Sequence, residues 1–219
     1  MSDEQLDDLT QPQRDRLAFV ELRVRFIGDI RRQDLVSRFG IQSAAATRDL
    51  AIYKELAPGN IDYDTKAKCY VLGEDFKPLF DFPPERVLSW LTQGFGDGEP
   101  SQLKAWVASE IPSRHTHPDL DVLACVTRAI HQECPIRVAY HSISSGQTER
   151  QIGPCALSDN GMRWHVGAFE RRYQEFRDFV STRIKGPVLL RDEEVQAHER
   201  GDQDIQALLQ GAFLGRVEL

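Results

Sequence analysis

The chain has 219 residues, 41% of them hydrophobic, which is enough for two small domains that each bury a core. No stretch approaches the roughly 20 apolar residues of a membrane-spanning helix, and the first residues have neither the basic nor the apolar region of a signal peptide. The four cysteines are scattered without a CxxC pair, which argues against a zinc site and for a reduced, cytoplasmic setting.

The net charge of −7 at pH 7 is at first sight unfavourable for a protein that binds nucleic acid. The charge is, however, unevenly distributed. Residues 13–72 hold 11 lysines and arginines against 8 acidic residues, whereas residues 1–12 hold four acidic residues and no base. The segment 13–72 is therefore the basic part of an acidic chain, which permits binding to a polyanion without requiring it.

A first helix is predicted to begin at Pro12, because proline suits the first helical position. Its apolar stripe contains Leu17, Val20, Val24 and Ile27, which recur at helical spacing. The arginines on its other faces are expected to be solvated, with phosphate contact as the alternative: Arg14, Arg16, Arg23 and Arg25.

A short helix, a tight turn and a second helix are predicted next. The short helix covers residues 31–39 and ends at Gly40, because glycine readily takes the left-handed conformation that ends a helix. Gln42 and Ser43 are expected to cap the second helix, residues 44 to about 56. The buried face of that helix is predicted to hold Ala46, Leu50 and Tyr53.

Two short runs typical of β-strands follow, residues 61–63 and 69–72, joined by residues 64–68. Pro58-Gly59-Asn60 separates them from the second helix. The order helix, tight turn, helix, hairpin is that of a winged helix-turn-helix, in which the second helix enters the major groove of DNA.

Small and polar residues at the start of that second helix would let its backbone approach the base edges. Gln42 is suited to adenine, Arg48 to guanine or a phosphate, and lysines at the hairpin tip to the DNA backbone. The predicted DNA-binding residues are Gln42, Ser43, Ala45, Thr47, Arg48, Lys66 and Lys68. The alternative is a small helical domain that binds only protein.

The segment after the hairpin is predicted to be a linker with connecting helices. Short helices are expected over residues 85–91 and 101–110. His115 and His117 lack the further ligands of a metal site, so Thr116 or His117 is expected to cap a helix that begins at Pro118 and runs to about residue 134.

From residue 135 the pattern changes to the alternation of β-strands. Strands are predicted over residues 136–142, 148–152, 154–157, 163–169 and 175–180, with a turn at Asp159-Asn160-Gly161. About five short strands in so few residues predict a small antiparallel barrel.

Several motifs between residues 12 and 190 also carry a resemblance. They are Tyr140-His141-Ser142, Glu149-Arg150, Pro154, residues 161–166 (Gly-Met-Arg-Trp-His-Val) and Phe176-Arg177-Asp178-Phe179 with Arg183-Ile184. These resemble a WYL domain, although His165 and Val166 replace the last two letters of the Trp-Tyr-Leu run that names the family. Upstream, residues 56–64 and 114–118 look like the WYL transcriptional repressors encoded beside bacterial phage-defence systems, the BREX- and CBASS-associated regulators.

The resemblance implies an Sm-like barrel that binds a ligand, a nucleotide or nucleic acid, and thereby alters DNA binding by the attached winged helix. Residues 136–185 fit an anionic ligand, because they hold eight lysines and arginines against five acidic residues. The candidate ligand-binding residues are Tyr140, Ser142, Arg163, His165, Arg171 and Arg177. The alternative is that the arginines are merely solvated, and we expect the aromatic Trp164, Phe176 and Phe179 to be core residues.

The predicted fold class is therefore α+β, with a winged helix-turn-helix over residues 12–76, a helical linker over 77–134 and a small antiparallel Sm-like β-barrel, the WYL domain, over 135–190. Residues 191–219 are predicted to be a short C-terminal segment, a truncated or reduced dimerisation region.

The predicted function is a cytoplasmic, homodimeric transcriptional regulator that binds an inverted repeat in double-stranded DNA, uses no cofactor and represses a phage-defence operon. The alternative is a protein that senses RNA or single-stranded DNA without regulating a promoter. An enzyme is disfavoured: Ser142 or Ser144 with His141 and Asp159 could form a hydrolytic triad, but no GxSxG motif supports it.

Overall fold

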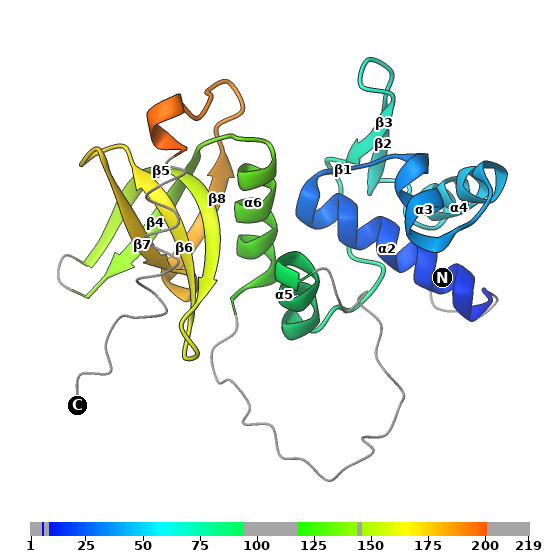
Figure 1. Ribbon diagram of the computed structural model, residues 1–219, viewed down its shortest axis with the longest axis horizontal. Coiled ribbons are helices and arrows are strands. Elements are labelled where there is room, and N and C mark those ends of the chain that lie inside the picture. Colours follow the sequence, from blue (N-terminus) through cyan, green and yellow to red (C-terminus); the bar gives the residue numbers. More distant parts are fainter. Residues whose placement is uncertain (1–5, 7–8, 94–117, 144–145, 201–219) are drawn as a thin grey trace, which may run out of the picture. The chain divides into compact units, whose positions relative to one another are not determined.

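The computed structural model describes residues 6, 9–93, 118–143 and 146–200, and the chain divides into two compact units between residues 108 and 109 (Figure 1). Each unit has its own buried core. Within the described ranges, no helix combines the length and the apolar character that crossing a membrane requires.

The first unit begins with helix α2 (Gln11–Ile27), which starts with Pro12 in its first turn and ends at Gly28 in the left-handed conformation. The predicted stripe is confirmed for Leu17, Val20 and Val24, which are fully buried, whereas Ile27 is half-buried.

The expectation that the arginines of α2 are solvated is wrong for three of them. Arg23 forms ion pairs with Asp34 at 3.3 Å and Asp29 at 3.8 Å. Arg16 donates two hydrogen bonds to the carboxylate of Asp49, at 2.7 and 3.2 Å. Arg25 is buried, and its guanidinium carbon lies 5.4 Å from the ring centre of Phe26 and 5.9 Å from that of Phe76. These side chains reach partners from other parts of the unit, which a helical pattern cannot indicate.

The helix-turn-helix is confirmed as α3 (Arg32–Phe39) and α4 (Ser43–Leu56), with Gly40 left-handed between them. Leu35 of α3 packs in one core with Ala46, Leu50 and Tyr53 of α4, as predicted. Gln42 stands at the N-cap position of α4, but its side chain makes no capping hydrogen bond.

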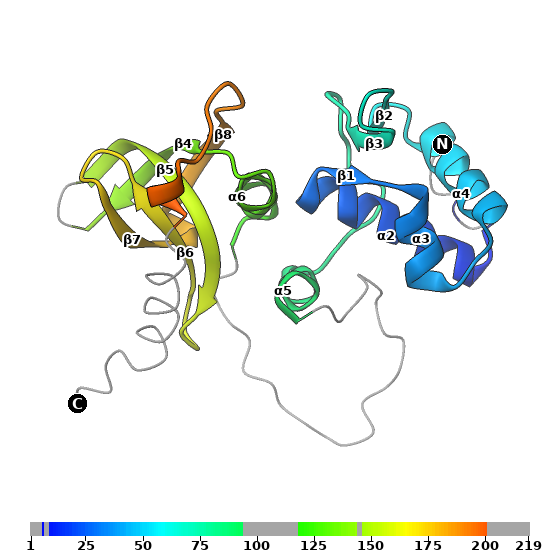
Figure 2. The same cartoon turned by 45° about the horizontal axis from the view of Figure 1, so that its top comes forward.

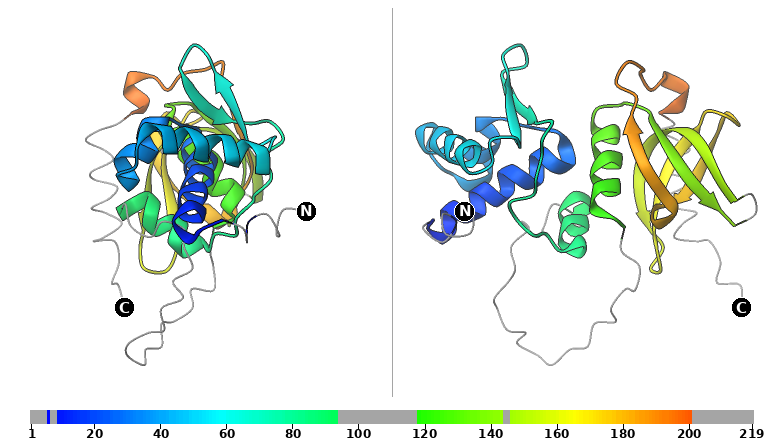
Figure 3. Two further views of the ribbon diagram at one scale, coloured as in Figure 1. Left: turned by 90° about the vertical axis from the view of Figure 1, so that its right-hand side faces the viewer. Right: turned by 180° about the vertical axis from the view of Figure 1, so that it is seen from behind.

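The hairpin is confirmed as β2 (Ile61–Asp64) and β3 (Cys69–Leu72), which pair in antiparallel register. A third strand that we did not predict, β1 (Asp29–Ile30), pairs with the other edge of β3. Figure 3 shows this hairpin, in cyan, extending beyond the helices of its unit.

The chain then returns to the helices of the same unit. Helix α5 (Pro84–Gln93) buries Val87 and Leu88, and the ring of its Trp90 lies 6.4 Å from that of Phe19 on α2. Residues 77–93, predicted as the start of a linker, therefore pack on the winged-helix core.

The second unit begins with α6 (Leu120–His131). Its N-cap is Asp119, whose side chain accepts hydrogen bonds from the amides of Asp121 and Val122 at 2.8 and 3.4 Å. The expectation that Thr116 or His117 caps this helix is therefore wrong. Those two residues, like His115 and the helix predicted over residues 101–110, lie outside the described residues.

A five-stranded antiparallel sheet completes this unit. Its strands are β4 (Ile136–Ser142), β5 (Gly146–Asp159), β6 (Trp164–Glu170), β7 (Glu175–Val180) and β8 (Ile184–Leu189), paired in the order β7-β6-β5-β4-β8. The two strands predicted over 148–152 and 154–157 form one strand, β5, with a bulge between Pro154 and Ala156. The fifth strand is β8, which we did not predict.

Helix α6 covers one face of this sheet, and Figure 2 shows it beside β8. Val122, Val126 and Ala129 of α6 pack in one core with residues that alternate along the strands, among them Val166 and Phe179. We call the strand face that carries these residues the inner face.

The segment after β8 folds back onto the same unit, and we call residues 190–200 the C-terminal clasp. Arg171, just after β6, donates to both carboxylate oxygens of Glu199 at 2.7 and 3.0 Å and to the main-chain oxygen of Glu194 at 3.0 Å, and it also pairs with Glu193. Val195 is buried, and its amide donates to the main-chain oxygen of Glu133 at 3.1 Å.

We predict that acid loosens the clasp. Burial alone would raise the pKa of Glu199, but hydrogen bonds from Arg171 and from the Gln196 amide lower it below its ordinary value of 4.5. A lowered pKa in the folded state means that the ion pair stabilises the clasp fully above pH 4.5 and loses this contribution as the pH falls further. The protection of the Val195 amide from hydrogen exchange, relative to an unfolded peptide at the same pH, should therefore fall below that pH before the sheet unfolds.

The variant Arg171→Ala should show the same loss of protection at Val195 already at neutral pH. Arg172→Ala is the matched control, because Arg172 is exposed and contacts the ring of Tyr173. Equal protection of Val195 in Arg171→Ala and in the wild-type protein would contradict the role given to this arginine.

Candidate nucleic-acid and ligand sites

The start of α4 presents the predicted base-reading residues on one exposed surface. Gln42, Ser43, Thr47 and Arg48 are exposed and Ala45 is half-buried. The hydroxyl of Thr47 donates to the main-chain oxygen of Ser43 at 2.9 Å, which holds that side chain against the first turn.

The opposite face of α4 is fixed to the core. Asp49 is 2% exposed and holds Arg16 of α2 through two hydrogen bonds, so the residue next to Arg48 is anchored. Sequence reasoning missed this pair, because 33 residues separate its members. The anchor determines which side of α4 faces outward.

The hairpin tip carries Lys66 and Lys68, both exposed as predicted. The carboxylate of Asp64 accepts hydrogen bonds from the amides of Lys66 and Ala67 at 2.7 and 3.0 Å, and Lys68 takes the left-handed conformation. The hydrogen bonds from Ala67 and Lys66 lower the pKa of Asp64. The turn is therefore held by its own side chain, and both lysines extend from an ordered loop.

Further exposed residues of this unit were missed. Arg31 and Arg32 at the start of α3 are exposed, and Tyr63 on β2 is 51% exposed with its ring 5.1 Å from that of Tyr70. The first helix of a helix-turn-helix crosses the DNA backbone, so paired arginines at its start are suited to phosphate contacts. The adjacent arginines were the available sequence signal.

On the second unit, the inner face ends in a cluster of charged and aromatic side chains. Glu170, at the end of β6, is completely buried. One of its oxygens accepts a hydrogen bond from Arg150 at 2.5 Å, and the other lies 3.1 Å from Arg177 in an ion pair without hydrogen-bond alignment. We call Arg150, Glu170 and Arg177 the arginine cluster.

Two tyrosines flank the arginine cluster. The guanidinium carbon of Arg177 lies 4.4 Å from the ring centre of Tyr173, and that of Arg150 lies 5.9 Å from Tyr173 and 6.0 Å from Tyr140. Arg150 is buried, whereas the side chain of Arg177 is 39% exposed and also donates to Glu175 at 2.5 Å. Cations stacked on aromatic rings beside carboxylates form a neutralised, partly open polar site.

The structure brings together only part of the predicted ligand set. Tyr140 and Arg177 meet at the arginine cluster, and Ser142, half-buried, follows Tyr140 on the same face of β4. Tyr140 is only 8% exposed, and its hydroxyl accepts a hydrogen bond from the Val180 amide at 3.3 Å, so it also supports the core. Arg150 and Glu170 were missed as members of the site.

The remaining three predicted ligand residues lie elsewhere. Arg163 is exposed in the turn before β6, and His165 faces away from the core residue Val166, as the alternation predicted. Burial raises the pKa of the nearby Asp178 carboxyl, an effect that the charge of His165 partly offsets. Arg171 holds the clasp through Glu199 and is not part of the arginine cluster.

The structure does not support the hydrolytic triad with Ser142, and Ser144, the other candidate nucleophile, lies outside the described residues. His141 and Ser142 are consecutive on β4, so their side chains point to opposite faces of the strand.

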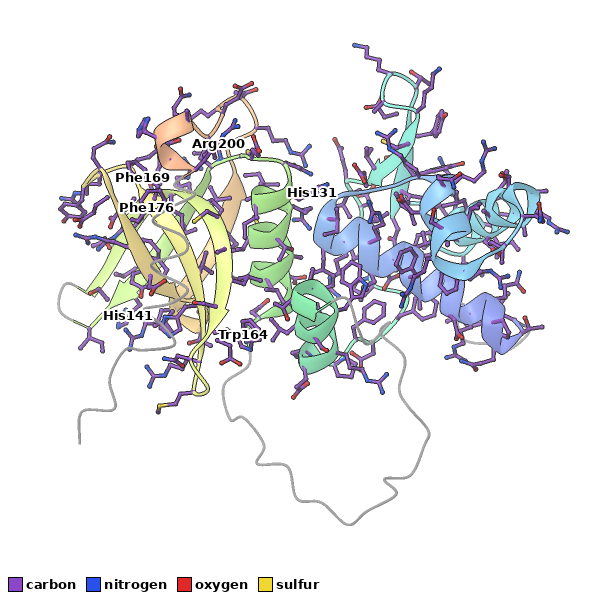
Figure 4. The ribbon with its side chains drawn as sticks, in the orientation of Figure 1. His131, His141, Trp164, Phe169, Phe176 and Arg200 are labelled. Atoms are coloured by element: carbon purple, nitrogen blue, oxygen red, sulfur yellow. The ribbon has the colours of Figure 1, made fainter. Side chains whose placement is uncertain are left out.

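Figure 4 labels His141 on β4 and shows Phe169 and Phe176, whose rings are 5.2 Å apart, on β6 and β7. Of the described residues, no three histidines, cysteines or carboxylates gather as a metal site.

Known proteins resemble this chain along most of its length. Residues 12–93 match the BrxR transcriptional regulator winged helix-turn-helix domain, and residues 121–189 match the WYL domain. The DNA-binding transcriptional repressor CapW of Pseudomonas aeruginosa is 35% identical over 78% of this chain and 59% of that protein. The repressor of the same name from Stenotrophomonas maltophilia is 31% identical over 77% of this chain and 58% of that protein.

The chain thus spans somewhat less than three fifths of the length of these relatives. Among solved structures, proteasome accessory factor B/C of Arthrobacter aurescens aligns with 84% of this chain and 32% of its own, at 20% identity and a TM-score of 0.34, a likeness too low to argue from. The two domain matches account for the two units described above. The chain therefore combines a BrxR-type winged helix-turn-helix domain with a WYL domain.

Proposed function

We propose that this protein is a DNA-binding transcriptional repressor whose WYL domain senses an anionic ligand. The observation that supports DNA binding best is the exposed start of α4, where Gln42, Ser43, Thr47 and Arg48 stand opposite a buried, ion-paired face. The relatives named CapW are DNA-binding transcriptional repressors, and the resemblance favours a phage-defence operon as the target. Such a regulator acts in the cytoplasm, without cofactor or catalysis.

The proposed DNA interface makes two kinds of contact, one to the bases and one to the phosphates. Side chains at the start of α4 would read base edges, whereas Lys66, Lys68 and the arginines that begin α3 would hold phosphates. The net charge of −7 does not oppose this interface, because the basic residues are concentrated in the winged helix.

The proposed ligand site is the arginine cluster with Tyr140, Ser142 and Tyr173. In the structure, two glutamates already occupy the arginines, so an anionic ligand must displace a carboxylate in order to bind. Arg177 is the one that would be released, because its side chain is 39% exposed while Arg150 is 8% exposed. A nucleotide would supply both the anion for Arg177 and a ring to stack on Tyr173.

The alternative proposal is a sensor of RNA or single-stranded DNA that does not regulate a promoter. The aromatic rings beside the arginines support this alternative as much as they support the ligand-sensing repressor, because proteins bind single strands through such aromatic and basic surfaces. The two proposals differ in one measurable property: the regulator requires a sequence preference on duplex DNA.

The first test concerns base reading. Arg48→Ala should weaken binding to a selected duplex by about 1–3 kcal/mol if Arg48 contacts a base. Lys66→Ala should lower the affinity for all duplexes by the same factor and make binding less dependent on salt, because it removes a phosphate contact. Lys54→Ala is the control, since this exposed lysine lies near the far end of α4. Unchanged affinity for the selected duplex in Arg48→Ala would refute this placement of α4.

A second test concerns the ligand. Arg177→Ala should fold, bind the duplex as the wild type does without ligand, and fail to respond to ligands, because a ligand acts only through its different affinities for the two protein states. The measurement is duplex affinity with and without a panel of nucleotides and short single-stranded oligonucleotides. Arg137→Ala, on the opposite face of β4, should respond normally. Loss of duplex binding in folded Arg177→Ala would mean that the WYL domain serves as a scaffold or DNA surface.

We also propose a homodimer on an inverted repeat, because one winged helix covers only a few base pairs. Light scattering should give twice the mass of one chain for the free protein, and that mass plus one duplex for the complex. A single chain on a single half-site would contradict the dimer while leaving DNA binding intact.

A further inference from the structure

A buried carboxylate on α2 binds the segment that leaves the hairpin. Glu21 is completely buried, 58 residues before its partner Leu79. The amide of Leu79 lies 3.0 and 2.9 Å from the two carboxylate oxygens, and the amide of Phe80 donates to Oε1 at 3.0 Å. Two consecutive main-chain amides are thus held by one side chain.

The same carboxylate holds the proposed recognition helix. The hydroxyl of Tyr53, a fully buried residue of α4, donates to Oε2 of Glu21 at 3.0 Å. Burial and the charge of Glu21 raise the pKa of this hydroxyl, so it remains a donor at any working pH. One carboxylate therefore joins α2, the helix that carries it, to α4 and to the segment after the hairpin.

Asn60 extends this contact to the start of the hairpin. Its side-chain amide donates to the Tyr53 hydroxyl at 3.0 Å and to the main-chain oxygen of Lys77 at 2.8 Å. In return, the Lys77 amide donates to the side-chain oxygen of Asn60 at 2.8 Å. Asn60 is 2% exposed and immediately precedes β2, so it joins both ends of the hairpin to α4.

Close backbone packing fixes the same place. The amide of Gly73 donates to the main-chain oxygen of Asn60 at 2.9 Å, and a side-chain carbon added to Gly73 would lie 2.1 Å from the oxygen of Gly59. The turn before β2 and the chain after β3 therefore cross with no room for a side chain.

These contacts depend on each other. Burial raises the pKa of Glu21, although hydrogen bonds from Phe80 and Leu79 oppose that shift. If residues 77–80 left their place, the carboxylate would lose its two main-chain donors, keep only the Tyr53 hydroxyl and have to be rehydrated. The docked segment and the arrangement of α2 and α4 are thus formed together.

We infer that Glu21, Tyr53 and Asn60 are positioning residues for sequence-specific DNA binding, which hold α4 and the hairpin in the reading arrangement only while residues 77–80 are docked. This inference rests on the proposed function. None of the three touches the proposed DNA surface, because all are buried. Residues 77–80 are also the route by which the chain leaves the hairpin, so a change that pulls on them would disturb DNA reading.

The test uses Glu21→Gln and Tyr53→Phe in the full chain. In Glu21→Gln, the side-chain oxygen can still accept hydrogen bonds, but the N–H₂ group that replaces the other oxygen faces groups that are themselves donors. Tyr53→Phe removes only the hydroxyl group. Two duplexes serve as probes, one selected from a random pool by the wild-type protein and one scrambled. Hydrogen exchange at the Leu79 and Phe80 amides reports docking.

Glu21→Gln should remain folded, exchange the Leu79 and Phe80 amides at least tenfold faster and bind the selected duplex at least tenfold more weakly. Its affinity for the scrambled duplex should stay within about twofold, because non-specific binding depends on exposed charge. A merely structural role would lower both affinities together. Tyr53→Phe should show the same pattern with smaller changes, and Glu149→Gln, at an exposed residue of β5, is the control.

Rapid exchange at Leu79 and Phe80 with unchanged discrimination between the duplexes would overturn the inference. If Glu21→Gln fails to fold, Tyr53→Phe decides: reduced discrimination supports positioning, and unchanged discrimination overturns it. A wild-type protein without any duplex preference would instead contradict the proposed function, so the two failures are distinguishable.

Discussion

The hydrogen bonds to the buried Glu21 carboxylate are the constraint on which the winged helix depends. A carboxyl group shielded from water is tolerated only when its oxygens have hydrogen-bond donors, and here the donors come from α4 and from the chain after β3. Apolar packing of Leu50 and Tyr53 would leave α4 some freedom to shift, because such packing is not directional. The hydrogen bonds, together with the Arg16–Asp49 pair, remove that freedom and so determine which residues face outward.

In the WYL domain, two adjacent residues at the end of β6 have separate roles. Glu170 points to the inner face and neutralises Arg150 and Arg177, while Arg171 holds the clasp through Glu199. Because neighbouring residues at a strand end point to opposite sides, one short segment joins the proposed ligand site to the chain that follows β8. A ligand that takes Arg177 from Glu170 would therefore act directly beside the clasp.

Local patterns in the sequence predicted most of the elements. The α3–turn–α4 unit follows from Gly40 and the Ala46–Leu50 spacing, and the hairpin from the break at Pro58-Gly59. Strand β8 was missed because Lys185, Gly186 and Pro187 interrupt its alternation. Strand β5 was divided in two because a bulge beside Pro154 disturbs the alternation of side chains.

The sites were predicted less completely, because they depend on contacts between distant parts of the chain. The exposure of Gln42, Thr47 and Arg48 follows from one helical face, and the sequence was sufficient for it. The pairing of Arg150 with Glu170 depends on strand register across 20 residues, and the role of Arg171 depends on a segment 28 residues away. The role of Glu21 was not predicted, since nothing near it in sequence indicates that the amides of residues 79 and 80 bind its carboxylate.

The central claim is that this protein recognises a defined sequence in duplex DNA. The most direct measurement is a cleavage-protection footprint on the DNA upstream of its own gene, in the presence of excess non-specific competitor DNA. The account predicts protection of an inverted repeat whose half-sites lie on one face of the duplex, one or more helical turns apart. Protection that competitor DNA removes entirely, or protection of single-stranded DNA or RNA alone, would contradict it.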